Sequence, residues 1–409
     1  LSGACMPIFP LQRDNMFNAL RPQPADKILA LIQMFKADLR ADKIDLGVGV
    51  YKDPAGLTPV MRAVKQAERQ LIEVETTKTY TALAGEPEFH RLMAELVLGP
   101  IFDQPRLSAI ATPGGTGALR QGFEMIKLAS QTAKVWLSNP TWPNHPSILR
   151  FLGIEMREYR YFDVASGGVD MAGMLSDLSQ VKAGDVVLLH GCCHNPTGAN
   201  LTMAQWADVV KVLNDRGAIP FVDLAYQGFG DGLDQDAQAT RLIASTCPEV
   251  LIAASCSKNF GIYRERTGIL MAMGDVGSQS VVQGNLAFLN RQNYSFPPDH
   301  GARLVTMILA DSSLRQSWQS ELEEVRQTML GLRQNLAEAL RTATNSDRFD
   351  FITTHRGMFS RLGVSPDIVE ALRVQNGIYM LGDSRLNIAG LNAKTVPILA
   401  QAVAGLLRG

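Results

Sequence analysis

Short apolar runs alternate with amphipathic stretches through the middle of the chain. Five runs are rich in Val, Ile and Leu and too short for long helices, which is typical of strands buried on both faces. These predicted strands are Ala133–Ser138, Asp185–Gly191, Ile219–Asp223, Val250–Ser255 and Gly268–Met273. Helical stretches such as Thr202–Arg216 lie between them. The alternation predicts an α/β fold with a mostly parallel sheet between helices, in which ligands bind at the carboxyl ends of the strands.

The pattern changes after about residue 312. Apolar residues recur there at three- and four-residue spacing, which predicts one long amphipathic helix. They are Trp318, Leu322, Val325, Met329, Leu332, Leu336 and Leu340. Strands are expected near Met358–Leu362 and Ile378–Leu381, followed by a helix around Lys394–Leu407. This part of the chain is therefore predicted to form a second, smaller α+β unit, and the pattern alone does not place the N-terminal segment.

Composition narrows the class of protein. The chain has 409 residues, 46% of them hydrophobic and 19% charged, which is ordinary for a globular protein. A net charge of -1 gives no reason to expect nucleic acid or an anionic membrane as partner. No apolar run approaches the roughly 18–20 residues that span a bilayer, and the first residues lack the pattern of a secretory signal. The five cysteines are an odd number and indicate free thiols, so a cytoplasmic protein is expected.

A lysine follows one of the predicted strands directly. Lys258 lies in Ser255-Cys256-Ser257-Lys258-Asn259-Phe260-Gly261. Burial would lower its pKa and supply the neutral amine that Schiff-base chemistry requires. The alternative is a lysine whose ammonium reaches water from the strand end. Ser255 and Arg266 favour the first interpretation, because a hydroxyl and a guanidinium together suit a phosphate dianion.

A glycine-rich segment and an aspartate add to this chemistry. Pro113-Gly114-Gly115-Thr116-Gly117 precedes an amphipathic helix, where free N–H groups attract an anion, although such turns also simply cap helices. Asp223 ends an apolar strand, and a carboxylate there is costly unless it meets a cation such as a protonated pyridine nitrogen. The alternative for Asp223 is a helix N-cap. Tyr226 could donate to a phenolic oxygen of the same ring.

The segment His190-Gly191-Cys192-Cys193-His194-Asn195-Pro196-Thr197-Gly198 allows several interpretations. Two cysteines and two histidines invite a zinc site, but adjacent cysteines suit tetrahedral ligation poorly, and no metal is predicted. A Cys–His hydrolase is conceivable, although no oxyanion motif accompanies it. Asn195, at a strand end, is the better candidate as a neutral hydrogen-bond donor to a ring oxygen.

Together these segments resemble the aspartate/aromatic aminotransferase family of fold-type I pyridoxal-phosphate enzymes. The resemblance rests on Ser-Cys-Ser-Lys-Asn-Phe-Gly with Arg266, Cys-Cys-His-Asn-Pro-Thr-Gly, Asp-Leu-Ala-Tyr-Gln-Gly-Phe and Pro-Gly-Gly-Thr-Gly-Ala-Leu-Arg. It extends from about Met16 to the C-terminus and is strongest to bacterial aromatic-amino-acid aminotransferases. It implies a large domain with a mostly parallel seven-stranded sheet, a smaller α+β domain and a homodimer.

The resemblance assigns the cofactor residues. Lys258 matches the lysine that holds pyridoxal 5'-phosphate as a Schiff base and later moves the substrate Cα proton. Asp223 matches the partner of the pyridine nitrogen, supported by His145, and with Lys258 and Tyr226 it makes up the catalytic set. The remaining matches are Trp142 stacked on the ring, Asn195 and Tyr226 at its O3′, and Gly115, Thr116, Ser255, Arg266 and the neighbouring subunit's Tyr80 at the phosphate.

The resemblance also assigns the substrate residues. Arg385 matches the arginine that binds the α-carboxylate in a bidentate manner. Arg291 matches the arginine that crosses the dimer interface to the distal carboxylate of aspartate or glutamate. Taken singly, either could be a solvated arginine. Gly49, Tyr80, Trp142 and Asn195 complete the expected substrate contacts.

The expected reaction is ping-pong transfer of the amino group of phenylalanine, tyrosine, tryptophan or aspartate to 2-oxoglutarate, with the cofactor alternating between pyridoxal and pyridoxamine forms. Cys256 and Phe296 depart from the pattern of aspartate-specific members, so strict aspartate preference is a weaker alternative. Other pyridoxal-phosphate reactions at Cα, and a cofactor-sensing regulator, are further alternatives. The expected boundaries are an N-terminal extension at 1–15, an arm and part of the small domain at 16–57, the large domain at 58–312 and the small domain at 313–409.

Overall fold

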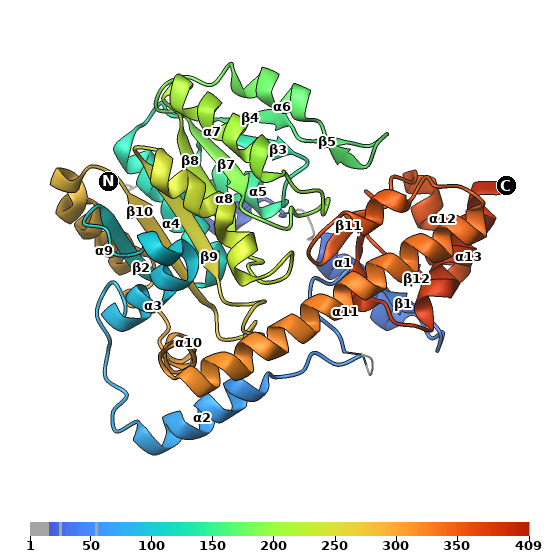
Figure 1. The fold of residues 1–409 in the computed structure, drawn as a ribbon, viewed down its shortest axis with the longest axis horizontal. Coiled ribbons are helices and arrows are strands. Elements are labelled where there is room, and N and C mark those ends of the chain that lie inside the picture. The colour runs from blue at the N-terminus through green and yellow to red at the C-terminus, as the bar shows by residue number, and fades with distance from the viewer. Residues whose placement is uncertain (1–15, 24–26, 54–55, 409) are drawn as a thin grey trace, which may run out of the picture.

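The chain folds into two units joined by one long helix (Figure 1). The computed structural model describes residues 16–23, 27–53 and 56–408, so the predicted extension at residues 1–15 lies outside them. Helix α11 (Ser312–Thr344) has 33 residues, begins after the N-cap Asp311 and ends at Asn345 in the left-handed conformation. The long amphipathic helix predicted from the apolar spacing is therefore present, and it extends from the sheet-containing unit to the smaller C-terminal unit.

A seven-stranded sheet forms the larger unit. Its spatial order is β2-β10-β9-β8-β7-β3-β4, and among these strands β10 alone runs in the direction opposite to the other six. The predicted mostly parallel α/β fold is confirmed, and each of the five predicted strands is present within two residues of its expected bounds. The strands are β2 (Leu107–Pro113), β3 (Val135–Asn139), β4 (Met156–Arg160), β7 (Val186–His190), β8 (Ile219–Leu224), β9 (Val250–Ser255) and β10 (Thr267–Met273).

Alternate strand residues enter two different cores, one on each face of the sheet, because successive side chains in a strand point to opposite sides. In β7, Val186 and Leu188 belong to one core and Val187 and Leu189 to the other. The first core includes residues of α4 (Gly114–Ala129), α5 (Asn144–Leu152) and α9 (Gln279–Asn293). The second includes residues of α2 (Arg62–Val74), α3 (Pro87–Leu98), α6 (Met171–Leu178), α7 (Met203–Arg216), α8 (Leu233–Thr246) and α10 (His300–Ala310).

Local signals set the bounds of these helices. Helix α7 begins after Thr202, whose hydroxyl accepts from the backbone N–H of Gln205 while the Gln205 side chain accepts from the backbone N–H of Thr202. This capping box satisfies donors that would otherwise lack partners. The helix ends at Gly217 in the left-handed conformation, which glycine adopts without steric cost. The predicted helix Thr202–Arg216 is thus confirmed to within its N-cap.

The smaller unit has its own core and includes an N-terminal strand. Strand β1 (Ile44–Asp45) pairs in parallel with β12 (Ile378–Tyr379), and β11 (Phe359–Arg361) pairs antiparallel with β13 (Arg385–Asn387). Its helices are α12 (Pro366–Asn376) and α13 (Thr395–Arg408), and α1 (Lys27–Ala37) lies nearby in Figure 1. Because Ile44 and Ile378 share one core, we propose that residues 16–57 and 313–409 form one domain and 58–312 the other.

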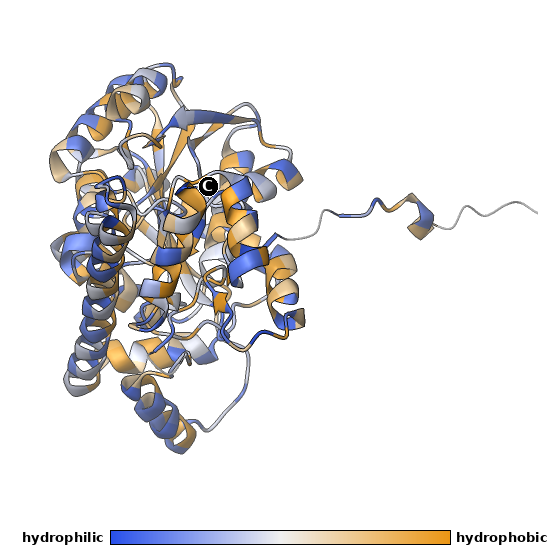
Figure 2. Ribbon diagram, turned by 90° about the vertical axis from the view of Figure 1, so that its right-hand side faces the viewer, coloured by the Kyte–Doolittle hydropathy of each residue, from blue (hydrophilic) through white to orange (hydrophobic). Residues whose placement is uncertain are grey.

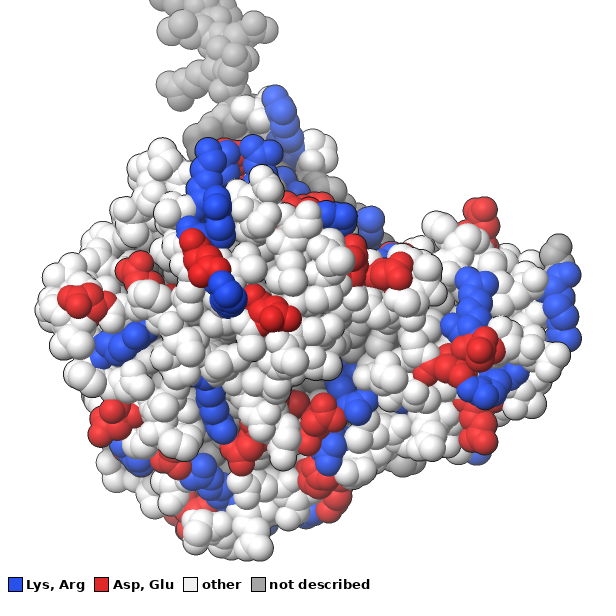
Figure 3. All heavy atoms as spheres, turned by 45° about the horizontal axis from the view of Figure 1, so that its top comes forward, with Lys and Arg blue, Asp and Glu red and all other residues white. Residues whose placement is uncertain are grey.

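The surface agrees with the near-neutral charge. Hydrophobic residues line the inner strands and inward helix faces, whereas hydrophilic residues occupy the outer faces (Figure 2). On the face shown in Figure 3, acidic and basic side chains are interspersed, without a large area of one sign. Among the described residues, no helix combines the length and apolar character needed to cross a membrane.

Candidate active site

A cavity of about 270 Å³ lies at the carboxyl ends of the central strands, between the two units. It is bordered by β8, the end of β9, the N-terminus of α4 and residues of the smaller unit. Eleven of the predicted site residues line it, although they are far apart in the sequence. They are Gly49, Gly115, Thr116, Trp142, Asn195, Asp223, Tyr226, Ser255, Lys258, Arg266 and Arg385.

Lys258 reaches this cavity from the loop after β9. The pKa of its amine is lowered to about 8, mainly by burial; Asp223 acts to raise this pKa and Arg266 acts to lower it. The Nζ atom lies 4.6 Å from the centre of the Tyr226 ring. A lysine in this environment has a substantial neutral fraction near neutral pH, as a nucleophilic amine requires. The structure therefore favours the buried amine over a lysine that extends to water.

Asp223 lies within β8 and is not a helix N-cap, because the next helix, α8, begins ten residues later after Gly232. Burial acts to raise the pKa of this carboxyl, but the hydrogen bond with His145, together with smaller electrostatic contributions that include Lys258, outweighs burial, so the pKa is lowered. His145 Nε2 lies 3.1 Å from Asp223 Oδ2. The predicted support of Asp223 by His145 is thus present as a direct contact.

This hydrogen-bond chain continues through two residues that the sequence analysis missed. His145 Nδ1 lies 2.8 Å from Thr141 Oγ1, which lies 3.1 Å from His190 Nε2. Burial, aided by His145, lowers the pKa of His190 to about 3, so its ring is neutral. A neutral histidine at the end of the chain leaves Asp223 as the buried anion of the group. In the sequence, Thr141 and His190 could be noticed only as polar residues at the ends of strands. That position does not specify which side chains contact each other.

The glycine-rich turn places the N-terminus of α4 against Arg266. Gly114 has φ of 71°, and a Cβ on it would lie 2.6 Å from Arg266 Nη2. A Cβ on Gly115 would lie 2.9 Å from the Cβ of Ser255. Only glycine allows this approach, and it brings free backbone N–H groups, a hydroxyl and a guanidinium to one end of the cavity. These donors fit a phosphate dianion, and Asp223 lies elsewhere on the same cavity wall.

Arg385 forms the opposite side of the cavity and is only 2% exposed. Its Nη1 donates to Asn195 Oδ1 at 3.4 Å, its Nη2 donates to the Gly47 carbonyl at 3.2 Å, and its Nε has no partner among the described residues. Burial lowers the pKa of this guanidinium. Arg385 is therefore not a solvated arginine. Its long contacts and its unpartnered Nε leave donors for a carboxylate.

Phe359 is a cavity residue that the sequence analysis did not identify. It belongs to β11, and its ring centre lies 4.3 Å from Arg385 Cζ. A Cβ on Gly49 would lie 2.9 Å from Phe359 Cζ, so the glycine is needed for the backbone to pass the ring. Tyr226 lies on the other side, with ring centres 6.4 Å apart. In the sequence, Phe359 is an aromatic residue in a predicted strand, and nothing in that pattern distinguishes a cavity residue from an ordinary core residue.

Tyr80 and Arg291 do not reach the cavity within one chain. Tyr80 is 84% exposed and its ring stacks on Phe296, with centres 4.8 Å apart. The Arg291 side chain is exposed, donates to Ser295 Oγ at 2.6 Å and has its Cζ 5.6 Å from the Phe296 ring. We call Tyr80, Arg291 and Phe296 the outer cluster. Their predicted roles depend on a neighbouring subunit.

Cys192 and Cys193 lie close to the Asp236 carboxylate, which is already occupied by hydrogen bonds. Cys192, Cys193 and Asp236 have possible ligand atoms within 4.8 Å of one another. However, the Asp236 carboxylate already accepts from the backbone N–H groups of Gly228, Gly230 and Asp231, each at 2.8 Å. Both thiols are free and buried, and their pKa values are raised, that of Cys192 by its hydrogen bond with Cys193 and that of Cys193 by burial. A raised pKa disfavours the thiolate that binds a metal, so these cysteines are better described as buried neutral thiols than as metal ligands.

The fold and the buried lysine, aspartate and arginine define an amino-group-transferring enzyme of the pyridoxal-phosphate type. The family model described as aminotransferase class I and II matches residues 41–403, and the chain belongs to this family. The resemblance found in the sequence is thereby confirmed.

Particular relatives make the likeness more specific. The chain is 58% identical over 389 residues to the aromatic-amino-acid aminotransferase of Paracoccus denitrificans, covering 95% of this chain and 99% of that protein. It is 41% identical over 396 residues to the aspartate aminotransferase of Salmonella typhi, covering 96% and 100%. A crystal structure of the aromatic-amino-acid aminotransferase from Burkholderia pseudomallei, covalently bound to pyridoxal phosphate, superposes with a TM-score of 0.94 at 39% identity, covering 96% and 100%.

Proposed function

We propose that this enzyme transfers the amino group of aromatic amino acids and of aspartate to 2-oxoglutarate, using pyridoxal 5'-phosphate. The observation that carries the proposal is a single cavity bordered by Lys258, Asp223 and Arg385. An amine, a carboxylate and a guanidinium at separate positions on its wall match a cofactor and an α-carboxylate bound side by side. The similarity to aromatic-amino-acid and aspartate aminotransferases supports this choice of substrates.

The cofactor would be held by residues of the large unit. Lys258 would form the Schiff base, Asp223 would pair with the ring nitrogen, and Trp142 would cover one face of the ring. Asn195 and Tyr226 would bind the ring oxygen, while Ser255, Arg266 and the N–H groups at Gly115 and Thr116 would bind the phosphate. Bound there, pyridoxal phosphate supplies an electron sink and carries the amino group from donor to acceptor.

The protein's own residues orient the substrate and move its proton. Arg385 binds the α-carboxylate of each amino acid and 2-oxo acid, which fixes Cα in the cavity. Once the amino group of the substrate had replaced it, the released Lys258 amine would take the proton from Cα, because its lowered pKa leaves part of it unprotonated near neutral pH. Asp223, held by His145, keeps a negative charge at the ring nitrogen. Phe359 and Trp142 exclude water from the reacting atoms.

One pocket must accept both acidic and aromatic side chains. We propose that Arg291 pairs with the distal carboxylate of a dicarboxylate and turns toward solvent when an aromatic ring is bound. A buried guanidinium beside an apolar ring would be costly without a partner. In the single chain, the Arg291 side chain is exposed and lies against Ser295 and the Phe296 ring, so turning outward requires no new arrangement.

We further propose a cytoplasmic homodimer whose active sites are shared. Tyr80 and Arg291 lie outside the cavity of their own chain, and Tyr80 exposes most of its ring. An exposed tyrosine stacked on a second aromatic ring is typical of a protein interface. The buried free thiols Cys192, Cys193, Cys247 and Cys256 agree with a reducing compartment.

The half-reaction tests the proposed function. The holoenzyme should convert its bound cofactor stoichiometrically from the pyridoxal to the pyridoxamine form when phenylalanine is added without an acceptor, and 2-oxoglutarate should reverse the absorbance change. A decarboxylase, a racemase or a cofactor-sensing regulator would not complete this cycle. A chain that binds the cofactor but gives no such conversion with phenylalanine, tyrosine, tryptophan or aspartate would contradict the proposal.

A further inference from the structure

Arg333 is a buried cation that has no acidic partner in the part of the chain that the structure describes. It lies in α11, in the smaller unit, and is 1% exposed. Among the described residues it makes no ion pair, and its acceptors are carbonyl oxygens and one hydroxyl. Burying a guanidinium in this way is costly, and an apolar side chain of similar volume would usually be tolerated better. Its presence therefore calls for a role other than packing.

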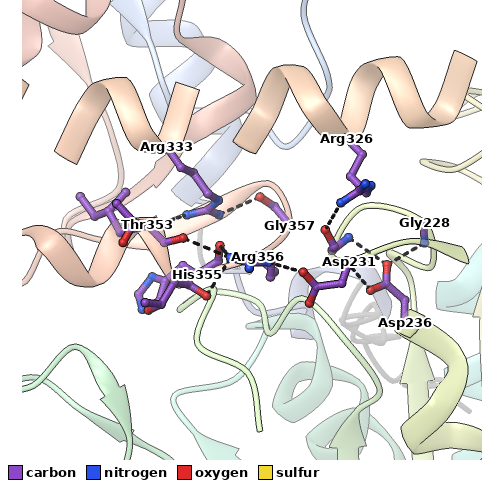
Figure 4. Close-up of polar contacts among 12 residues, drawn as sticks. Gly228, Asp231, Asp236, Arg326, Arg333, Thr353, His355, Arg356 and Gly357 are labelled. Carbon is purple, nitrogen blue, oxygen red and sulfur yellow. Dashed lines mark hydrogen bonds and ion pairs between the residues drawn. The ribbon is translucent and has the colours of Figure 1, made fainter. Parts of the chain in front are cut away.

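The hydrogen bonds of the Arg333 side chain all go to one short segment of the chain, residues 352–360. Its Nη2 donates to the carbonyls of Gly357 and Phe359, each at 2.7 Å. Its Nη1 donates to Ser360 Oγ at 2.7 Å and to the Ile352 carbonyl at 3.4 Å. Figure 4 shows the Arg333 guanidinium directed from α11 toward Gly357. The guanidinium thus binds the backbone on both sides of Met358 and fixes the start of β11.

The same segment is held from the large unit. His355 Nδ1 lies 3.0 Å from Ser360 Oγ and His355 Nε2 lies 2.6 Å from the Gly167 carbonyl, in the turn between β5 (Phe162–Asp163) and β6 (Gly168–Val169). Arg356 pairs with Asp231 at 2.6 Å, and its backbone N–H donates to the Gly198 carbonyl at 2.9 Å (Figure 4). Within the small unit, β11 pairs with β13, and Arg333 adds a side-chain contact from α11, so it helps to set where β11 lies relative to that helix.

Strand geometry connects this arrangement to the cavity. Successive residues of β11 point to opposite faces, so Ser360 faces Arg333 while Phe359 faces the cavity. Phe359 covers Arg385 at 4.3 Å and lies against Gly49. Arg385 itself makes only long hydrogen bonds, to Asn195 and Gly47. The position of its guanidinium therefore depends on the ring above it.

We propose that Arg333 is a positioning residue for substrate binding, which fixes the backbone of β11 so that Phe359 holds the Arg385 guanidinium in place for the α-carboxylate. This inference rests on the proposed function, since it takes Arg385 to be the carboxylate ligand. Arg333 touches neither substrate nor cofactor. Its effect should appear in the binding of every carboxylate substrate, aromatic or acidic, and not in cofactor binding, because the cofactor residues belong to the large unit.

The test uses holoenzyme variants Arg333→Met and Arg333→Lys. Both should raise KM for phenylalanine and aspartate by about 10- to 100-fold, with kcat changed less than about fivefold, because misplaced binding groups weaken ground state and transition state together. The Kd of 3-phenylpropionate, which has the carboxylate and ring but no amino group, should rise by the same factor. Lysine cannot span four acceptors, so Arg333→Lys should not restore binding.

The matched control is Arg341→Met. Arg341 lies on the same helix, is exposed and pairs with Asp350, so its loss reports the cost of removing an arginine from α11. It should leave KM and the 3-phenylpropionate Kd unchanged. If Arg333→Met does not fold, Arg333→Lys carries the test alone. Unchanged KM and Kd in a folded Arg333 variant would overturn the proposal.

A double-mutant cycle distinguishes positioning from general stability. If Arg333 acts through Phe359, then Arg333→Lys should change the 3-phenylpropionate Kd by less than about threefold in a Phe359→Leu background. Additive effects in the cycle would mean that Arg333 stabilises the fold without directing the ring, and would overturn the proposal. A wild-type enzyme that fails the phenylalanine half-reaction would instead contradict the proposed function, before any variant is compared.

Discussion

The inner cavity is enclosed within a single chain, whereas the residues of the outer cluster lie at its surface. In the inner cavity, Lys258, Asp223 and Arg385 are enclosed, and Asp223 and Arg385 have defined hydrogen-bond partners. In the outer cluster, Tyr80 and Arg291 are exposed and both lie against the Phe296 ring. The parts needed by every substrate are thus preorganised by one chain. Under the proposed function, the part that distinguishes acidic from aromatic side chains lies at the surface of the single chain, where a second subunit would complete the site.

This difference has an energetic reason. Groups that bind the invariant α-carboxylate and the cofactor gain from rigid burial, because desolvated hydrogen bonds are strong and their geometry is fixed in advance. A group that must sometimes pair with a carboxylate and sometimes withdraw cannot be fixed in the same way. The comparison predicts that inner substitutions impair all substrates, whereas outer substitutions change only the preference among them.

The largest effect is expected at Lys258. Lys258→Ala should still bind pyridoxal phosphate noncovalently but lose turnover with every substrate by about four orders of magnitude, because both cofactor attachment and proton transfer use this amine. Steady-state kinetics with phenylalanine and aspartate measures the loss. Borohydride reduction and peptide mapping of the wild type should place the label on Lys258, and a label on a different lysine would refute the assignment.

The second largest loss of activity is expected at Asp223. Asp223→Ala should lower kcat by about 10²- to 10³-fold for both substrate classes, since a preorganised charge at the ring nitrogen is lost. Asp223→Glu should retain more activity because the negative charge remains. The two variants are to be compared in single-turnover experiments with phenylalanine. Equal rates would mean that the carboxylate has no electrostatic role.

Arg291 should show the selective behaviour of the outer cluster. Arg291→Leu should lower kcat/KM for aspartate by about 10²-fold, because losing one partner of a desolvated ion pair costs roughly 2–5 kcal/mol. Phenylalanine should stay within a few-fold of its starting value or improve. An equal loss for both substrates would mean that Arg291 supports the subunit interface and does not select substrates.

Hybrid dimers sharpen this prediction. Mixing Lys258→Ala subunits with Arg291→Leu subunits should restore aspartate activity in part, because one of the two shared sites then combines Lys258 from one chain with Arg291 from the other. If both residues served the same chain's site, no mixed dimer would contain an intact aspartate site. The recovery is measured as aspartate turnover after refolding the mixture, with each variant alone as control.

The smallest effect concerns the stability of the cofactor-free enzyme. The pKa of Lys258 is lowered from 10.5 to about 8 by burial, so the folded chain binds this proton less tightly than the unfolded chain. Stability should therefore rise as pH increases from about 8 to about 10.5, by at most about 3 kcal/mol. Urea unfolding of wild type and Lys258→Met at several pH values isolates this contribution, and a difference between the two that does not vary with pH would contradict it.

Much of the inner cavity could be predicted from the sequence. Lys258, Asp223 and Asn195 each lie at the end of a strand or in the loop that follows it. Because the strands of a mostly parallel sheet end at a common edge, the strand pattern alone predicts that these residues lie close together. Local signals also fixed helices, as Thr202 and Gly217 do for α7. Arg385 and Gly49 were reached only through the resemblance, because their approach to the cavity depends on how the small unit packs.

The sequence by itself determined the strands, the long helix and the chemistry of the residues at the strand ends, because these depend on periodicity and on side-chain type within a few residues. The tertiary structure alone decided which distant groups meet. The chain from Asp223 through His145 and Thr141 to His190, the Phe359 ring over Arg385 and the binding of β11 by Arg333 each join segments with no local relation. Their positions follow from the packing of two cores around α11, and a hydrogen bond or ring contact is sensitive to shifts of an ångström that no pattern along the chain records.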